Sequence, residues 1–438
     1  MDSAAHKGLL SVRQVFWIWL PLAATWWLMS GEGPLANALV ARMSDPRINL
    51  AALGVALSFT MLFEAPMLLI LSASITLVSG YPDYLRLRRF TIVASGGLTA
   101  LLALAFSPAV FGVICRSVLD LTGEVAEQAR LAGYLCLPIP LSVAYRRFYQ
   151  GLLIKHGLAS RVAVGTVARF LTMALSAFLF YLTDAMPGAS AGALALSLGM
   201  LIEAVVAREF AAPVVRKLEE ALPYRPALSY SEIFRFYLPL AANSVIFMAL
   251  QPLLTFFLSH SVRPIDSLAV FPVVWGCIFF FVSQGISLQE IVLSQIGDKH
   301  QNWKVLQVFT LRLGAVMALM LGAIFFTPFA ATLYTTVLGL SAELAQLAHP
   351  AAMILAAMPF FTLLGGWLRA LHMQRRRTVP ITVSSAMEVF LAAGAMWGML
   401  KFSNQPGAVL APAALLLGRF AAVAWLYRSY IRNGRKSD

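Results

Sequence analysis

The chain is divided into long apolar runs separated by short polar segments. Twelve of these runs are long enough to cross ~30 Å of hydrocarbon, which takes roughly 20 helical residues. A backbone inside a bilayer must satisfy its own hydrogen bonds, so we expect each run to be helical. The alternation over ~10 residues that marks a membrane β-barrel is absent from the sequence. The pattern predicts an all-α polytopic membrane protein with spans at about 14–42, 49–79, 90–115, 131–154, 161–183, 188–210, 233–260, 267–294, 306–335, 347–371, 379–401 and 405–428.

Composition supports this class and excludes others. Hydrophobic residues make up 60% of the chain and charged residues 12%, whereas soluble proteins are about 25% charged. The net charge of +13 is not concentrated in a soluble basic module, so nucleic-acid binding is not expected. The three cysteines, Cys115, Cys136 and Cys277, lie in apolar runs and indicate no disulfide framework.

One long stretch of the sequence occurs twice. Residues 16–51 match residues 234–269 without a gap, at 11 of 36 positions. Three of the matches are prolines, which apolar composition alone would not readily align: Pro21, Pro34 and Pro46 fall on Pro239, Pro252 and Pro264. A second match carries 118–130 onto 337–349, an offset only one position larger than the first. The repetition predicts two equivalent halves of six helices each.

The distribution of basic residues predicts how the chain is oriented. With both ends placed in the cytoplasm, and with residues near a span end counted with the adjoining segment, 25 Lys and Arg fall on the cytoplasmic side and six on the outer side. The cytoplasmic count includes Arg146 and Arg147, and the remaining two, Arg169 and Arg419, lie deeper within spans. Short cytoplasmic loops collect such residues, so both termini are expected inside a cell membrane, inner or plasma. We expect an N-terminal lobe at 1–210, a cytoplasmic linker at 211–232 and a C-terminal lobe at 233–438. Six helices per half give both lobes one orientation, related by an axis along the membrane normal.

No catalytic or cofactor signature is present in the sequence. HExxH, P-loop, GxSxG and DxDxDG-type patterns are all missing, and the six histidines mostly fall at helix ends or in loops. We therefore expect neither enzymatic activity nor a cofactor or metal.

Ionisable residues inside apolar spans are the strongest functional candidates, because charges are costly in hydrocarbon and usually face a cavity or a partner. Glu32 lies at a Gly/Pro break in the first span, and Glu64 precedes Pro66 in the second. Both are candidates for coupling or gating. Glu203 and Glu290 are weaker candidates, placed where they could reach the inner surface.

Arginines and glutamines within the spans are the candidates for substrate binding. Arg146 and Arg147 lie about two turns before the end of the fourth span. They either snorkel to the surface or form a patch that attracts anions. Gln150 and Gln251 complete the set, with Gln251 in the seventh span.

Arg169 and Glu388 form an equivalent pair of opposite charge. The offset of the second match, which carries residue 118 to residue 337, also places Arg169 of the fifth span on Glu388 of the eleventh. Opposite charges at equal depth could form a structural ion pair, or a pair that opens as the halves rock. In the second case Arg169 would bind an anionic substrate and Glu388 would gate.

Several motifs carry a resemblance to a known group of exporters. The tandem six-helix halves, the Leu20-Pro21 motif and the YQGLL sequence at 149–153 resemble the multidrug/oligosaccharidyl-lipid/polysaccharide (MOP) exporter superfamily, which includes the MATE drug exporters and the lipid-linked sugar flippases. Within it the chain looks most similar to the progressive ankylosis family. The stretches that support this are GEGPLANAL (31–39), LLIKHG (152–157), MPFFTLLGGWLRALHMQRRRTV (358–379) and SSAMEV (384–389).

The resemblance implies a MATE-like fold with alternating access and export of small organic anions such as citrate, nucleotides or pyrophosphate. The resemblance also implies that the animal members have an acidic residue at the position of Arg169 and a basic residue at the position of Glu388. The two charges of this pair are therefore exchanged in this chain. The expected partners are an anionic small molecule and membrane lipids, and no nucleic acid is expected. The protein itself is expected to be a monomer. Three alternatives remain open: a cation-coupled drug antiporter that uses Glu32 and Glu64, a lipid-linked oligosaccharide flippase, and a non-transporting scaffold.

Overall fold

The computed structural model describes residues 10–121, 123–156, 158–220, 228–296, 301–375 and 379–434, and all regular structure in these ranges is helical. Nine helical segments in this part of the chain are long and apolar enough to span a membrane, and three of them join two or three consecutive elements. The other three predicted spans each consist of two shorter helices: α1 (Val12–Ser30) with α2 (Glu32–Val40), α7 (Gly123–Leu135) with α8 (Pro138–Lys155), and α11 (Tyr230–Met248) with α12 (Leu250–Ser259). The prediction of an all-α, polytopic membrane protein is confirmed.

Prolines determine where two of these helices end. Proline in a helix interior clashes with the carbonyl four residues earlier. Pro34 would clash at Ser30, where α1 ends, and Pro252 would clash at Met248, where α11 ends. The break that the Gly/Pro pattern predicts in the first span is therefore confirmed, and it recurs in the seventh.

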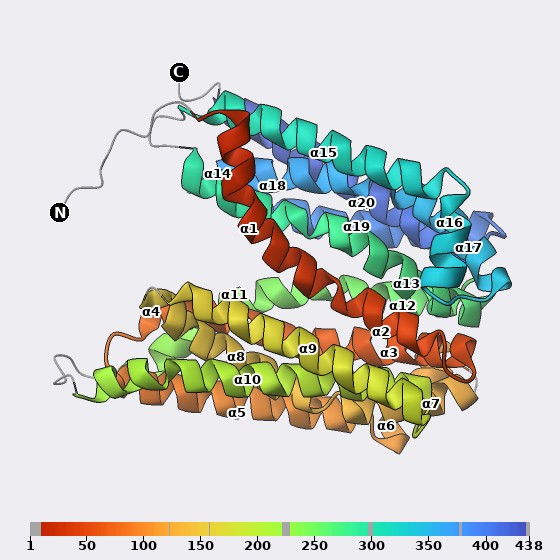
Figure 1. Ribbon diagram of the computed structural model, residues 1–438, viewed down its shortest axis with the longest axis horizontal. Coiled ribbons are helices and arrows are strands. Elements are labelled where there is room, and N and C mark those ends of the chain that lie inside the picture. Colours follow the sequence, from red (N-terminus) through yellow and green to blue (C-terminus); the bar gives the residue numbers. More distant parts are fainter. Residues whose placement is uncertain are drawn as a thin grey trace. The chain divides into compact units, whose positions relative to one another are not determined.

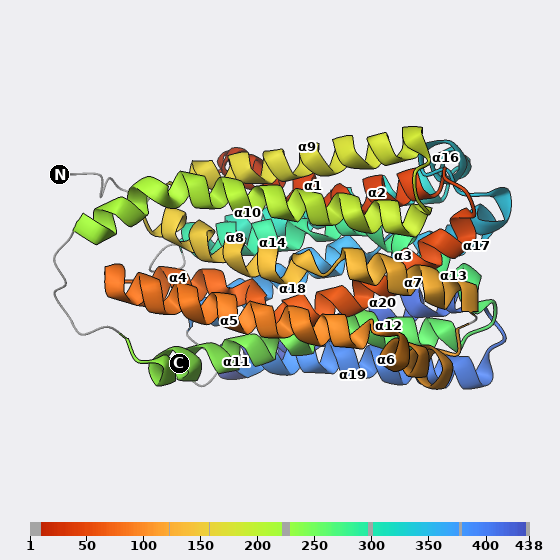
Figure 2. The same cartoon turned by 90° about the horizontal axis from the view of Figure 1, so that it is seen from below.

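The contacts divide the chain into two compact units. Unit 2 comprises Leu35–Pro272 with Leu338–Leu340. Within it α8 packs against α4, α5 and α10, which can be followed in Figures 1 and 2. Buried Tyr84, Phe148, Tyr149 and Tyr237 belong to its core. Unit 2 contains α2 from Leu35 onward, together with α7, α8, α11 and α12. Its other elements are α3 (Pro46–Glu64), η1 (Ala65–Leu69), α4 (Ile70–Leu77), α5 (Tyr81–Ala105), α6 (Pro108–Val113), η2 (Ile114–Leu119), α9 (Ala159–Thr183), α10 (Gly188–Glu220) and the first part of α13 (Pro264–Val282).

Unit 1 comprises Met1–Pro34, Val273–Val337 and Ser341–Asp438. In it α1 lies against α14 and α15 (Figure 1). Trp19 of α1 is 1% exposed, and its indole donates a hydrogen bond to Ser287 Oγ at 2.9 Å. The elements that follow α13 are α14 (Gln284–Gln295), α15 (Trp303–Phe325), α16 (Phe329–Thr332), η3 (Leu333–Val337), α17 (Ala342–Leu355), α18 (Met358–Gln374), α19 (Val379–Phe402) and α20 (Gly407–Gly434).

The helix boundaries repeat with the spacing seen in the sequence. The offset that carries residue 16 to residue 234 also carries both bounds of α1 onto those of α11, and the offset of the second match carries the start of α10 onto the start of α20. Ser11 and Ser229 cap α1 and α11 with the same capping box, completed by Gln14 and Glu232. The duplication therefore extends from sequence to local structure.

The contacts group the first helix of each half with helices of the other half. α1 belongs to unit 1, whereas α11 and α12 belong to unit 2. The lobes at 1–210 and 233–438 remain a prediction about the sequence repeat. The linker at 211–232 also remains a prediction; its first residues continue α10 to Glu220, with Ala211 and Val214 still buried. Apolar content falls before the helix ends, and residues 221–227 of the linker lie outside the described residues.

Candidate functional site

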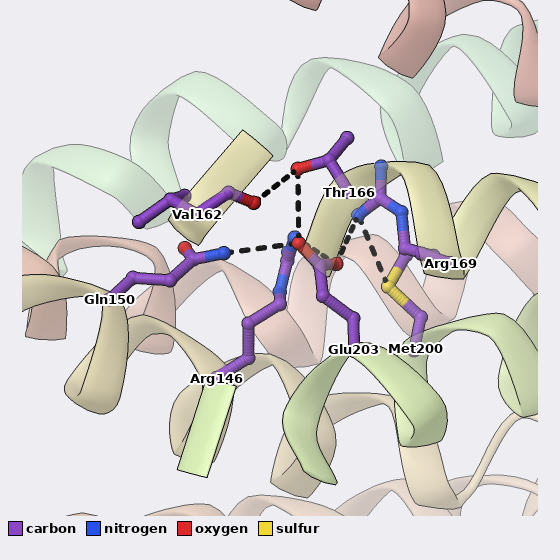
Figure 3. Close-up of polar contacts among 7 residues, drawn as sticks. All are labelled: Arg146, Gln150, Val162, Thr166, Arg169, Met200 and Glu203. Carbon is purple, nitrogen blue, oxygen red and sulfur yellow. Dashed lines mark hydrogen bonds and ion pairs between the residues drawn. The ribbon is translucent and has the colours of Figure 1, made fainter. Parts of the chain in front are cut away.

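A buried carboxylate joins three helices of unit 2. Glu203 on α10 is 0% exposed. Its Oε2 lies 2.7 Å from Arg146 Nη1 and 3.2 Å from Arg169 Nη1. Its Oε1 accepts hydrogen bonds from Gln150 Nε2 at 3.0 Å and Thr166 Oγ1 at 3.3 Å. Figure 3 shows these side chains converging on Glu203 from α8 and α9.

The spacing of these residues along α8 and α9 explains why they meet. Residues three or four apart lie on one face of a helix. Arg146 and Gln150 are separated by four residues on α8, and Thr166 and Arg169 by three on α9. Each helix therefore presents one arginine and one neutral donor to the same carboxylate.

Glu203 is fully engaged, because both of its oxygens accept donors and two guanidinium groups balance its charge. A buried charge is tolerated when it is paired and hydrogen-bonded in this way. Arg146 is buried, so the structure excludes snorkelling, one of the two alternatives that the sequence left open for it. Glu203 is buried too and does not reach the inner surface. Sequence position gives depth but not the partner across the helix interface.

Two further ionisable residues belong to this cluster without bonding to it. Within the described part of the chain, neither Arg147 nor Glu64 has a hydrogen bond or an ion pair, and Arg147 Nε is buried without a partner. Glu64 interacts electrostatically with Arg146, Arg147 and Arg169. Three arginines thus face two glutamates, which leaves a formal charge of +1 in the cluster.

Unit 1 contains a rearranged copy of the cluster. Glu388 Oε1 on α19 lies 2.7 Å from Arg419 Nη2 on α20. Arg369 on α18 interacts electrostatically with both, but it has no hydrogen bond or ion pair among the described residues, and its Nε is buried. Two arginines face one glutamate, so the formal charge is again +1.

The offset of the second sequence match relates the two clusters position by position. It carries Gln150 to Arg369, Arg169 to Glu388 and Met200 to Arg419. The helices correspond, but the charges of the side chains differ: the position of the basic Arg169 on α9 is occupied by the acidic Glu388 on α19. Sequence reasoning placed Arg419 within a span but chose neither it nor Arg369 as a site residue, although the offset that aligned Arg169 with Glu388 would have pointed to both.

The predicted site residues fall into separate groups. Arg146, Gln150 and Arg169 bond to Glu203 as one cluster, with Glu64 and Arg147 beside it. Glu388 belongs to the cluster of unit 1. Arg169 and Glu388 each have an ion-pair partner within their own unit, so neither needs the other for charge balance.

Two further predicted residues lie on α2 and α12. Glu32 is buried at the first residue of α2, and Gln251 is half-buried on α12. Neither is among the described residues that bond to Glu203 or to Glu388. Their roles in gating and substrate binding stay predictions.

Comparison with solved structures identifies the fold of the chain. No protein-family model matches the sequence, and a search of the curated proteins found no match. An inward-facing multidrug resistance MATE family transporter of the MOP superfamily matches with a TM-score of 0.63 at 16% identity, over 98% of this chain and 97% of that one. The chain has the MATE fold.

Two further solved structures match over most of their length. The lipid II flippase MurJ, in an inward closed conformation, gives a TM-score of 0.70 at 13% identity over 93% of this chain and 87% of its own. A MOP superfamily transporter from Pyrococcus furiosus gives 0.56 at 16% identity over 98% and 94%. That transporter was described as having a binding pocket of reversed polarity that suggests a different function. At these identities the likeness establishes the architecture of a multi-pass membrane protein with twelve helices.

Proposed function

We propose that this protein is an alternating-access transporter that exports small organic anions of the citrate, nucleotide or pyrophosphate type, the substrate class that its resemblance to the progressive ankylosis family implies. One observation carries the proposal: Arg147 is a guanidinium in a membrane span with no hydrogen bond or ion pair among the described residues. Intramembrane cations that lack a partner are costly, so they mark a pathway or a binding site.

The chemistry of Arg147 suits a carboxylate or a phosphate. A guanidinium presents a planar fork of donors that binds such groups in a bidentate manner. Its neighbour Arg146 is already bonded to Glu203, so Arg147 is the residue of the pair with donors available. The cluster carries a formal excess of one positive charge, which a bound anion would offset.

The second cluster supports the same substrate class. Arg369 in unit 1 resembles Arg147, because its guanidinium also has no hydrogen bond or ion pair with any residue that the structure describes. A protein that moved cations would gain nothing from an excess of arginine in both units.

The accompanying proposals concern topology and assembly. The excess of Lys and Arg in the segments expected on the cytoplasmic side supports a cell-membrane location with both termini in the cytoplasm. We propose a monomer as the transporting unit. A C-terminal reporter that is active only in the cytoplasm tests the orientation directly.

Ligand-induced thermal stabilisation of the purified full chain tests the anion proposal. The ligands are citrate, malate, pyrophosphate and ATP, with cationic dyes for comparison, because selective binding to the folded state raises its melting temperature. We expect at least one anion to raise it and Arg147→Gln to weaken that anion's binding about tenfold or more, the loss of a hydrogen bond to a charged group. Arg208→Gln provides the matched control, because Arg208 is exposed on α10.

The proposal is wrong if no anion stabilises the protein, or if Arg147→Gln and Arg208→Gln bind the anion equally well. Uptake of the same anion into proteoliposomes then separates transport from binding. A protein that binds the anion without moving it would be a scaffold or a receptor.

The carboxylate of Glu64 favours a second candidate, the cation-coupled drug antiporter. Glu64 has no hydrogen-bond partner among the described residues, so it could take up a proton or a cation. Stabilisation by cationic dyes alone, abolished by Glu64→Gln but not by Arg147→Gln, would favour this candidate over anion export.

A further inference from the structure

A groove of about 530 Å³ lies between α5 and α11 in unit 2, away from the Glu203 cluster. Phe90, Val93 and Ala94 line it from α5, and Tyr230 lines it from the start of α11. The only charged residue among its described lining is Arg89. The groove is open, because the Val93 side chain is 67% exposed and that of Tyr230 is 48% exposed.

The groove lies where the polar start of α5 gives way to its apolar part. The apolar run begins at about residue 90, so we expect Arg89 at the membrane surface and Val93 about one turn deeper. Arginine and tyrosine are both favoured at such an interface. The lining thus changes from basic and aromatic to purely apolar with depth.

The charge around the opening is positive. Arg86 and Arg88 share the first turns of α5 with Arg89, and Arg235 lies in the second turn of α11. The two nearby carboxylates are engaged by backbone amides: Asp83 accepts from Ser79 and Leu228, and Glu232 accepts from Ser229. A negatively charged headgroup would therefore meet Arg89 in the groove, with Arg86 and Arg235 on adjacent turns. Arg88 interacts instead with Tyr145 and Tyr149.

The opposite end of unit 2 has the reverse character. A pocket of about 260 Å³ at the start of α3 is lined by Asp45, Glu124 and Asp184, with no basic residue in its described lining. Because α3 to α4 crosses the membrane as one span, this pocket and the start of α5 face opposite surfaces. An anionic lipid is thus favoured at one end of the unit only.

We propose that the groove formed by Arg89, Phe90, Val93, Ala94 and Tyr230 binds an anionic phospholipid. The phosphate contacts the Arg89 guanidinium and the Tyr230 hydroxyl, and one acyl chain packs along Phe90 and Val93. Basic residues near a bilayer surface recognise anionic headgroups in this way. The lipid would join α11 to α5, two helices from different halves of the sequence. This proposal does not depend on the identity of the transported substrate.

Native mass spectrometry of the purified full chain tests the proposal, with phosphatidylglycerol and phosphatidylcholine that carry identical acyl chains. We expect the wild type to retain phosphatidylglycerol preferentially and Arg89→Gln to lower that retention about fivefold, as expected for one basic residue near the surface. Val93→Trp fills the groove and should lower the retention of both lipids. Arg116→Gln, at an exposed arginine on η2, should leave retention unchanged.

Three results would overturn the proposal. They are equal retention of the two lipids, unchanged phosphatidylglycerol retention in both Arg89→Gln and Val93→Trp, and displacement of the lipid by an equal concentration of glycerol 3-phosphate. The last result would assign the site to a free phosphate compound. Melting temperatures equal to that of the wild type show that the variants are folded, which is expected because both side chains are exposed.

Discussion

Glu388 on α19 occupies the position that Arg169 occupies on α9, and each contacts the residue 31 positions further along the chain. Arg169 Nη1 lies 3.6 Å from the sulfur of Met200, and Glu388 lies 2.7 Å from Arg419. The same pair of sites is in contact in both halves, but only the second is an ion pair. Duplication has preserved the helix contact while the charges diverged.

Loss of the Glu203 carboxylate should destabilise the protein strongly. In Glu203→Gln, Arg146 and Arg169 lose the charge that balances both of them while remaining buried. Removing one partner of a buried pair costs about 3–5 kcal/mol. Thermal unfolding of the purified protein in detergent measures the loss. Glu209→Gln, at an exposed position on the same helix, should change stability by less than about 0.5 kcal/mol. Similar melting temperatures for the two variants would contradict the assigned role of Glu203.

The pair formed by Glu388 and Arg419 should show energetic coupling. We expect Glu388→Gln and Arg419→Gln each to destabilise the protein, and the double variant to lose less than the sum, with a coupling energy of about 0.5–3 kcal/mol. A double-mutant cycle of unfolding free energies measures this quantity. Additive losses would mean that the contact between these two side chains makes no net contribution.

Equivalent glycines hold the helix pairs together and should respond alike to substitution. A Cβ at Gly199 would lie 3.0 Å from the Arg169 carbonyl oxygen, and one at Gly418 would lie 2.6 Å from that of Glu388. Overpacking of this kind costs about 1–3 kcal/mol, so both alanine variants should lower the melting temperature, Gly418→Ala by more.

The control for these variants is Gly394→Ala on α19, where a Cβ meets nothing within 4 Å. There the substitution should stabilise the helix by about 0.5–1 kcal/mol. If Gly394→Ala and Gly418→Ala had the same effect, close helix packing at Gly418 would not be the reason for glycine.

Asp266 should matter more than either arginine that binds it. Its carboxylate is 0% exposed and pairs with Arg47 and with Arg263, whose Nε lies 2.6 Å away. We expect Asp266→Asn to cost about 3–5 kcal/mol, because the buried site loses its charge balance. Arg47→Gln should cost less than about 1 kcal/mol, since Arg47 is half exposed and Arg263 remains. Equal losses in thermal unfolding would show that Arg47 is the dominant partner.

The sequence by itself determined the membrane class, the twelve spans, the repeat and the first helix break. These follow from local properties: a run of about 20 apolar residues must be helical in a bilayer, and Pro34 must end α1. The repeat also placed Arg169 and Glu388 at matching positions, which the contacts of α9 with α10 and of α19 with α20 reproduce.

Only the tertiary structure shows which side chains and which helices contact one another. Apolar periodicity cannot show that Glu203 of α10 meets Arg146 of α8, or that Arg147 beside it is left without a bond in the described part of the chain, because one residue along a helix turns the side chain by about 100° toward different neighbours. Nor could it show that α1 packs with α14 and α15, whereas α11 packs with η1 and α5. Which helices meet depends on close packing between segments far apart in the sequence, so it cannot be predicted from the local sequence pattern of either helix.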